Sequence, residues 1–210
     1  MHSPVSLLVN TKADKAAEAD QILVASILAG EPHAFRELID RTEKLVAQFV
    51  FKMIPAAAER KDIAQEVYLK VHQNLPGFRF QSKLSTWIGQ ITYNTCLHYL
   101  EKKRPVLLEH FFYDTPKEPG DGIAFRREPG ENETENKLYE RELKGIIEGA
   151  VSQLPPLYQT LIGLYYQEEL SLSEICEITG LPDGTVKAYL FRARKQLKVI
   201  LLKPQKRQLL

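Results

Sequence analysis

The sequence predicts an all-α protein of two small helical domains joined by a flexible linker. Apolar residues recur at helical spacing over about 21–103 and again over about 137–200. Neither stretch shows the alternation of apolar and polar residues that marks β-strands. The intervening residues are rich in proline, glycine and acids and lack a helical period. We therefore expect a loosely ordered leader (1–20), a first domain (21–105), an acidic linker (106–136) and a second domain (137–210).

Charge is distributed unevenly along the chain. The formal net charge is +1, yet residues 181–210 carry eight Lys or Arg and one acid. The linker carries a net charge of about −5. This asymmetry indicates that the C-terminal end contacts a polyanion and that the linker does not.

Several classes of protein are disfavoured by what the sequence lacks. Cys96 and Cys176 show neither disulfide-framework nor zinc-site spacing, so we expect small buried side chains in a reducing compartment. No apolar run approaches the roughly 18 residues of a membrane span, so we expect a cytoplasmic protein without membrane insertion. No catalytic triad, metal cluster or phosphate-binding glycine loop is recognisable, so we expect neither an enzyme nor a bound cofactor.

The first domain is expected to contain helices over about 35–53, 59–74 and 85–103. Pro55 and Pro105 end the first and third of these, and the Asn74-Leu-Pro-Gly77 segment ends the second. The second domain is expected to contain helices over 137–152 and 156–168, followed by a pair of short helices.

That pair has the signature of a helix-turn-helix. Ser171 and Glu174 form a capping box, Gly180 suits the left-handed position after a helix, and Pro182 fits the next first turn. The apolar residues of both helices then share one face. The outward positions of the second helix are Lys187, Ala188, Phe191, Arg192, Arg194, Lys195 and Lys198. Such a face can contact phosphates and base edges, but it is also compatible with a helical hairpin whose basic face is solvated.

The stretch LPPLYQTLIGLYYQEELSLSEICEITGLPDGTVKAYLFRARKQL resembles the C-terminal DNA-binding domain of bacterial sigma factors of the extracytoplasmic-function (ECF) group. The resemblance implies that the outward face reads the minus-thirty-five promoter element. Family members often carry Ser-Arg where this chain has Ala188 and Tyr189. A hydrogen-bonding group and a positive charge are therefore missing, and the promoter sequence read is expected to differ.

The segment DIAQEVYLKVHQNLPGFRFQSKLSTWIGQITYNTCLHYLEKKRP resembles the other essential domain of the same group. Its landmarks are Asp-x-x-Gln-Glu, Phe-x-x-x-x-x-x-Ser-Thr-Trp, and an Asn before a basic helix end. The two matches lie in the expected order and together cover about two thirds of the chain. They imply a sigma factor that binds core RNA polymerase through the β′ clamp helices and the β flap, binds promoter DNA, and is controlled by an anti-sigma factor.

The resemblance gives roles to two parts of the first domain. A polar stripe that includes Asp62, Gln65 and Glu66 is expected to dock on the β′ clamp helices, although by itself it could simply face water. The loop GFRFQSKLSTW is expected to hold unpaired bases of the minus-ten element, since aromatic rings beside positive charge suit that task. The candidates there are Arg79, Phe80, Gln81, Ser82 and Lys83. Trp87 is expected to pack in the core.

The helix that follows offers Asn94, His98, Lys102 and Lys103 to the duplex just upstream. Tyr93 occupies a position where family members often carry Arg, and we expect it to stack where a cation would pair. A stand-alone helix-turn-helix regulator is the main alternative, but it leaves the loop and the stripe unexplained and normally requires a dimer. A protein-binding adaptor leaves the basic face without a role.

Overall fold

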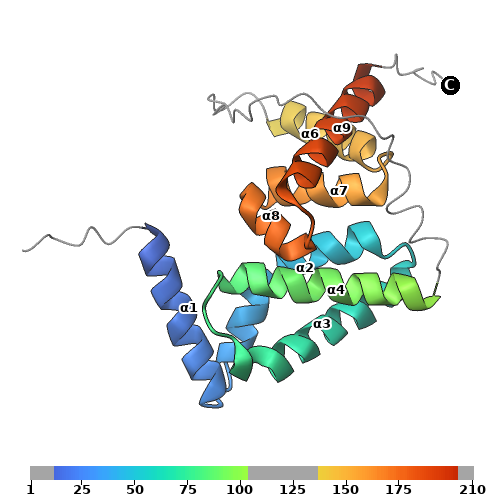
Figure 1. Ribbon diagram of the computed structural model, residues 1–210. Coiled ribbons are helices and arrows are strands. Elements are labelled where there is room, and N and C mark those ends of the chain that lie inside the picture. Colours follow the sequence, from blue (N-terminus) through green and yellow to red (C-terminus); the bar gives the residue numbers. More distant parts are fainter. Residues whose placement is uncertain (1–11, 104–136, 203–210) are drawn as a thin grey trace, which may run out of the picture.

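The computed structural model describes residues 12–103 and 137–202, and every regular element in these two ranges is helical (Figure 1). The all-α prediction is therefore confirmed. The expected linker, 106–136, lies outside the described residues. The helices are α1 (Lys12–Leu28), α2 (Ala34–Met53), α3 (Arg60–Asn74), α4 (Leu84–Lys103), α6 (Lys137–Val151), α7 (Pro156–Ile162), α8 (Leu172–Thr179) and α9 (Asp183–Leu202).

Helices α2, α3 and α4 form the core of the N-terminal half. Leu38 and Phe49 of α2, Val67 of α3 and Ile88 of α4 are fully buried, as the helical spacing of apolar residues predicts. Helix α2 stops before Pro55, whose ring prevents another helical turn. A short 3-10 turn, η1 (Ala57–Glu59), precedes α3, and a second one, η2 (Leu75–Gly77), follows it.

Helix α1 corrects the expected leader. Residues 1–11 lie outside the described residues, but 12–20 are helical rather than loosely ordered. Leu23, Val24 and Ile27 bury one side of this helix against the rest of the N-terminal half. Gly30, at a φ of 80°, follows the helix end in a conformation that favours glycine.

The C-terminal half contains α6, α7, α8 and α9. Pro156 opens α7, where its missing N–H costs nothing, and a π-helical turn, η3 (Gly163–Gln167), extends α7 toward α8. Leu157 and Leu161 of α7 are fully buried. Contacts between α7 and α9 and between α8 and α9 close this half around a small apolar core.

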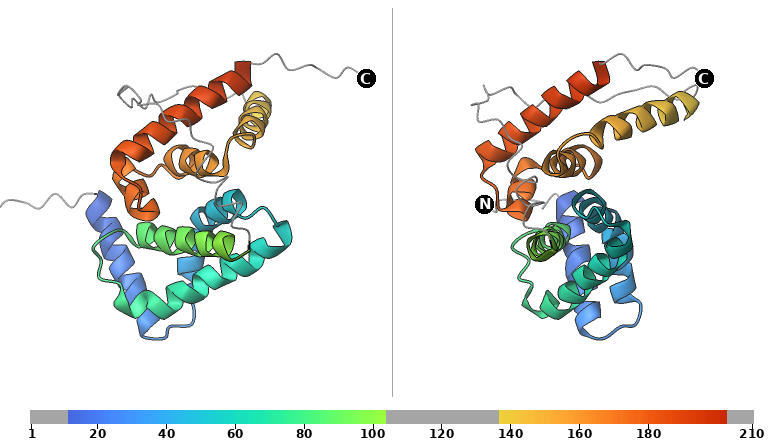
Figure 2. Two further views of the ribbon diagram at one scale, coloured as in Figure 1. Left: turned by 45° about the vertical axis from the view of Figure 1, so that its right-hand side comes forward. Right: turned by 90° about the vertical axis from the view of Figure 1, so that its right-hand side faces the viewer.

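The two halves pack against each other. Helices α2 and α4 lie in the middle of the molecule, with α3 on one side and with α7 and α8 on the opposite side (Figures 1 and 2). The buried apolar residues of the halves form one continuous cluster. None of the helices in the described ranges is long and apolar enough to cross a membrane.

Candidate nucleic-acid and protein-binding surfaces

The turn between α8 and α9 has the geometry that the sequence predicted. The Ser171 hydroxyl accepts a hydrogen bond from the Glu174 N–H, and the Glu174 carboxylate accepts one from the Ser171 N–H at 2.8 Å. These bonds satisfy amides that a helix start leaves unpaired. Gly180 has a φ of 69° and reverses the chain after α8. The capping box and the glycine together fix how α9 leaves the turn.

Helix α9 separates an apolar face from a cationic one. Val186, Leu190 and Ala193 are fully buried, which turns the candidate recognition residues away from the core. The exposed members are Lys187, Lys195 and Lys198, and the half-buried members are Ala188, Phe191, Arg192 and Arg194. All seven lie off the buried face. Phe191 was expected to point outward, and its side chain is half-buried.

Two cations on this face are held in place within the chain. The Lys187 ammonium lies 2.6 Å from the Asp183 carboxylate, one turn earlier. The Arg194 Nε donates to the Leu190 carbonyl at 3.3 Å. An exposed pair of this kind is worth only about 0.3–0.5 kcal/mol. A phosphate can therefore displace Asp183 at little cost.

Tyr93 does not lie at the surface as expected, and Tyr189 is half-buried. Tyr93 is 1% exposed and packs edge-on against Phe49, with ring centres 6.1 Å apart. Burial, with Tyr189 nearby, raises the pKa of Tyr93 far above its usual value. Tyr189 is half-buried, and its ring centre lies 5.9 Å from that of Tyr158. The prediction that Tyr93 stacks at the DNA surface is wrong, and Tyr189 contributes to packing.

Three aromatic rings, from the end of η2, the following loop and the first turn of α4, pack together at tilted angles. The centre of the Phe78 ring lies 4.7 Å from that of Phe80 and 4.9 Å from that of Trp87. Trp87 is half-buried against the core, which confirms its predicted role. Phe80 stays 41% exposed at the end of the stack. Its φ of 54° is unusual for a bulky residue, and such strain is often found at functional sites.

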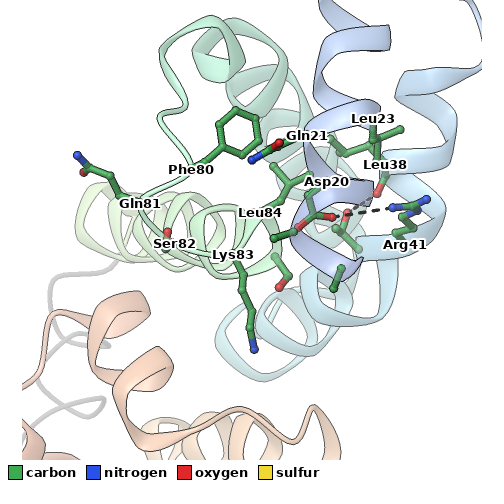
Figure 3. Close-up of a pocket in the computed structure, with 14 residues that line it drawn as sticks. Asp20, Gln21, Leu23, Leu38, Arg41, Phe80, Gln81, Ser82, Lys83 and Leu84 are labelled. Atoms are coloured by element: carbon green, nitrogen blue, oxygen red, sulfur yellow. Dashed lines mark hydrogen bonds and ion pairs between the residues drawn. The ribbon is translucent and has the colours of Figure 1, made fainter. Parts of the chain in front are cut away.

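This loop forms one wall of a cavity of about 740 Å³ (Figure 3). Phe80, Gln81, Ser82 and Lys83 lie on the loop side, and α1 and α2 provide the opposite wall. Arg79 is exposed beside it in the sequence. Cavities of about 300–1,000 Å³ hold small molecules, so the volume is ample for one unstacked base beside an aromatic ring and a cation.

Asp20 and Arg41 in this cavity escaped the sequence analysis. They lie 3.9 Å apart on α1 and α2, and Arg41 also pairs with Glu37. Burial raises the pKa of Asp20, and a hydrogen bond from the Leu84 backbone and the charge of Arg41 partly oppose that shift. Asp20 thus connects α1 to the first residue of α4. Asp20 was not predicted as a site residue because residues 1–20 were expected to form a loosely ordered leader, whereas 12–20 are helical.

Lys83 contacts the other half of the molecule. Its ammonium lies 2.8 Å from the Glu174 carboxylate, at the start of α8. Burial pushes the pKa of Glu174 upward, but hydrogen bonds from Lys83 and Ser171 hold it below its usual value. The candidate melting loop is therefore joined to the helix-turn-helix through the residue that caps it.

Some of the predicted polymerase-binding residues meet some of those expected to contact the upstream duplex in one groove. Asp62 and Glu66 of α3 and His98 and Lys102 of α4 line a cavity of about 580 Å³ between the two helices. Lys70 spans this groove, 2.7 Å from Glu66 and 3.3 Å from the Thr95 hydroxyl. The exposed side chains of this region include Asp62, Gln65, Glu66, Asn94, His98 and Lys102. The side chain of Lys103 lies outside what the structure describes.

The two cysteines differ in burial, so the expectation of small buried side chains is confirmed for Cys96 only. Cys96 is fully buried, and burial raises the pKa of its thiol to about 12. Cys176 is half-buried on α8, and both are free thiols. Among the described residues, no group of three or more His, Cys, Asp or Glu is placed to hold a metal ion.

The helix-turn-helix formed by α8 and α9 is typical of DNA-binding transcription factors. Comparison with known proteins gives the same class. The family models for Sigma-70 region 2 and Sigma-70 region 4 match residues 38–106 and 144–197. The ECF RNA polymerase sigma-E factor of Escherichia coli K12 is 30% identical over 187 residues, covering 85% of this chain and 92% of that protein. The ECF RNA polymerase sigma factor SigW of Bacillus subtilis is 29% identical, covering 83% and 92%. The chain belongs to the ECF sigma factors.

Solved structures share the fold. CnrH, in complex with the cytosolic domain of CnrY, has a TM-score of 0.57 at 20% identity, covering 87% of this chain and 97% of that one. The sigma factor RpoE of Bartonella quintana, in complex with the anti-sigma factor NepR, has a TM-score of 0.57 at 17% identity, covering 82% and 99%. These likenesses support the two-domain helical fold.

Proposed function

We propose that this protein directs core RNA polymerase to specific promoters and helps to melt them. The observation that carries the proposal is the family membership, with the region 2 and region 4 matches in order on one chain. The relatives are sigma factors rather than enzymes. We place the activity in the cytoplasm, where core RNA polymerase works, and we assign no catalytic residue.

The helix-turn-helix is proposed to read the minus-thirty-five element. The cationic face of α9 points away from the apolar core. The capping box and Gly180 fix the turn that precedes this helix. Lys187 and Lys195 are proposed to contact phosphates, which position the protein, and Arg192 to contact a base edge, which gives specificity. Ala188 and Phe191 offer apolar contacts suited to a thymine methyl group.

The cavity beside Phe80 is proposed to hold an unpaired base of the minus-ten element. A flipped base needs a stacking partner and polar groups for its edge. The exposed ring of Phe80 supplies the stacking partner, and Gln81 and Ser82 supply the polar groups. Arg79 and Lys83 are proposed to contact the phosphates of the non-template strand. Asn94, His98, Lys102 and Lys103 are proposed to contact the duplex upstream.

Two further surfaces are proposed to bind the polymerase. The polar stripe of Asp62, Gln65 and Glu66 is exposed on α3 and is proposed to dock on the β′ clamp helices. In the C-terminal half, large apolar side chains on α6 and the end of α9 are at least 40% exposed, and such patches often mark protein interaction sites. These are Leu143, Ile146, Ile147, Val199, Leu201 and Leu202. We propose the β flap as their partner.

Control by an anti-sigma factor is also part of the proposal. The RpoE structure was solved with the anti-sigma factor NepR, and the CnrH structure with the cytosolic domain of CnrY. We also propose two domains joined by the acidic linker, in line with the region 2 and region 4 matches. The minus-ten domain covers 21–105, and the minus-thirty-five domain covers 137–210.

Transcription in vitro tests the proposal. Purified core RNA polymerase is given a genomic promoter library with and without this chain, and transcript starts are mapped. We expect promoter-specific starts only when the chain is present, and weaker ones with Glu66→Lys. Specific DNA binding without any polymerase-dependent transcript would instead identify a stand-alone helix-turn-helix regulator.

A further inference from the structure

Helix α4 begins at a buried residue that the preceding side chain cannot cap. Leu84 opens the helix and is 3% exposed. The first bond along the helix runs from the Trp87 N–H to the Lys83 carbonyl at 3.1 Å, so the Leu84 N–H has no partner within the helix. The side chain of Lys83 offers donors and no acceptor. A buried N–H needs a partner, and this one must come from elsewhere in the fold.

Asp20 of α1 supplies that partner. Its carboxylate accepts a hydrogen bond from the Leu84 backbone N–H. A negative charge at the N-terminus of a helix is also stabilised by the helix dipole. Arg41 of α2 lies 3.9 Å from the same carboxylate and favours its ionised form (Figure 3). A side chain of α1 thus caps α4, and α2 supports it.

This bond fixes one end of the loop that carries Phe80. The other end is fixed at η2, where the Phe78 N–H donates to the Leu75 carbonyl at 3.0 Å. Between these ends Phe80 holds its φ of 54°, and such a backbone persists only where the surrounding structure holds it. Asp20 and Phe80 both line the cavity of about 740 Å³. The separation between α1 and the Phe80 ring therefore depends on the bond from Asp20 to Leu84.

We propose that Asp20 is a positioning residue for base capture, which holds the start of α4 against α1 and so keeps the Phe80 ring where the cavity admits one unstacked base. This role rests on the proposed function of the cavity. Without the bond, the first turn of α4 frays and the loop leaves the conformation that forms the cavity. Because only the formed fraction can hold a base, the apparent affinity for that base falls in proportion.

Two substitutions at Asp20 separate the hydrogen bond from the charge. Asp20→Ala removes the acceptor, and alanine is the best helix former, so α1 is preserved. Asp20→Asn removes the charge but keeps a carbonyl oxygen, and asparagine caps helices about as well as aspartate. Glu18→Ala is the matched control, because it removes an exposed acid from the same helix.

Fluorescence of Trp87 measures the position of the loop in the free, full-length chain. Trp87 is the single tryptophan. It lies in the first turn of α4, and its ring centre is 4.9 Å from that of Phe78. We expect Asp20→Ala to raise the constant for quenching by acrylamide, and Asp20→Asn and Glu18→Ala to match the wild type. An unchanged constant in Asp20→Ala overturns the proposal, as does an Asp20→Asn variant that behaves like Asp20→Ala.

Promoter opening with core RNA polymerase measures what the position of the loop does for function. We expect the equilibrium for opening, followed by permanganate reactivity of unpaired thymines, to fall about fivefold in Asp20→Ala, the effect of losing one helix cap of typical strength. Asp20→Asn should restore opening, and initial promoter binding should stay nearly intact in both variants. A loss of opening that Asp20→Asn does not restore overturns the proposal.

A double variant distinguishes positioning from a contribution to stability alone. If Asp20 acts through the Phe80 ring, adding Asp20→Ala to Phe80→Ala should cause no further loss of opening. Losses that multiply overturn the proposal, because Asp20 would then act independently of the ring. Absence of promoter-specific opening by the wild type refutes the proposed function instead. The fluorescence measurement uses neither polymerase nor DNA, so it still decides whether Asp20 holds the loop.

Discussion

Gly180 offers a sharp test of how the turn positions the recognition helix. It sits at a φ of 69°, and a methyl group built on it meets nothing within 4 Å. In Gly180→Ala the cost is therefore conformational alone, about 1–2 kcal/mol for an L-residue in the left-handed region. The restricted unfolded chain returns about 0.4–1 kcal/mol. We expect a net loss of about 1 kcal/mol.

Gly184→Ala is the matched control. Gly184 lies in the first turn of α9, also has open space around its Cα, and does not have a positive φ. Alanine is favoured over glycine within a helix by up to about 1 kcal/mol, so this variant should be as stable as the wild type or more so. Urea unfolding followed by circular dichroism measures both variants. Equal stability of the two would refute the role given to the backbone of Gly180.

Three further predictions concern the proposed surfaces. Arg192→Ala should weaken binding to a minus-thirty-five duplex by about 1–3 kcal/mol and relax base preference at one position; unchanged affinity and preference would exclude base reading. Phe80→Ala should reduce permanganate reactivity of unpaired thymines while leaving initial promoter binding nearly intact, and unaltered footprints would show that the ring holds no base. Glu66→Lys should weaken assembly with core RNA polymerase, whereas Glu18→Lys, on exposed α1, should not; equal effects would indicate that only net charge matters.

Local sequence signals predicted the helices that carry a strong apolar period or a clear stop. Helix α3 and helix α4 were expected over 59–74 and 85–103 and begin within one residue of those bounds. The turn before α9 was predictable because Ser171, Glu174 and Gly180 each act on the backbone next to them. The faces of α9 followed from the same reasoning, since the helical period separates its buried residues from its cations.

Contacts between distant parts of the chain could not be predicted in this way. The alanine-rich residues 12–20 carry little apolar periodicity, so the N-terminal half of α1 was missed, and with it the place of Asp20 beside Arg41. Tyr93 was placed with its neighbour Asn94, yet successive helical residues point about 100° apart. Asn94 is exposed, whereas Tyr93 faces Phe49 and the opposite half. No local sequence pattern predicts the packing of Gly89 on Ile178, because these residues lie far apart in the chain.

Helix α4 separates the contact with α8 from the groove beside α3. Gly89 and His98 are nine residues apart, so they lie on opposite sides of this helix. The Gly89 side holds α8, while the His98 side lines the groove with Asp62 and Glu66 of α3. The stripe proposed to bind the polymerase and this groove are therefore accessible while α8 stays packed on the other side of α4.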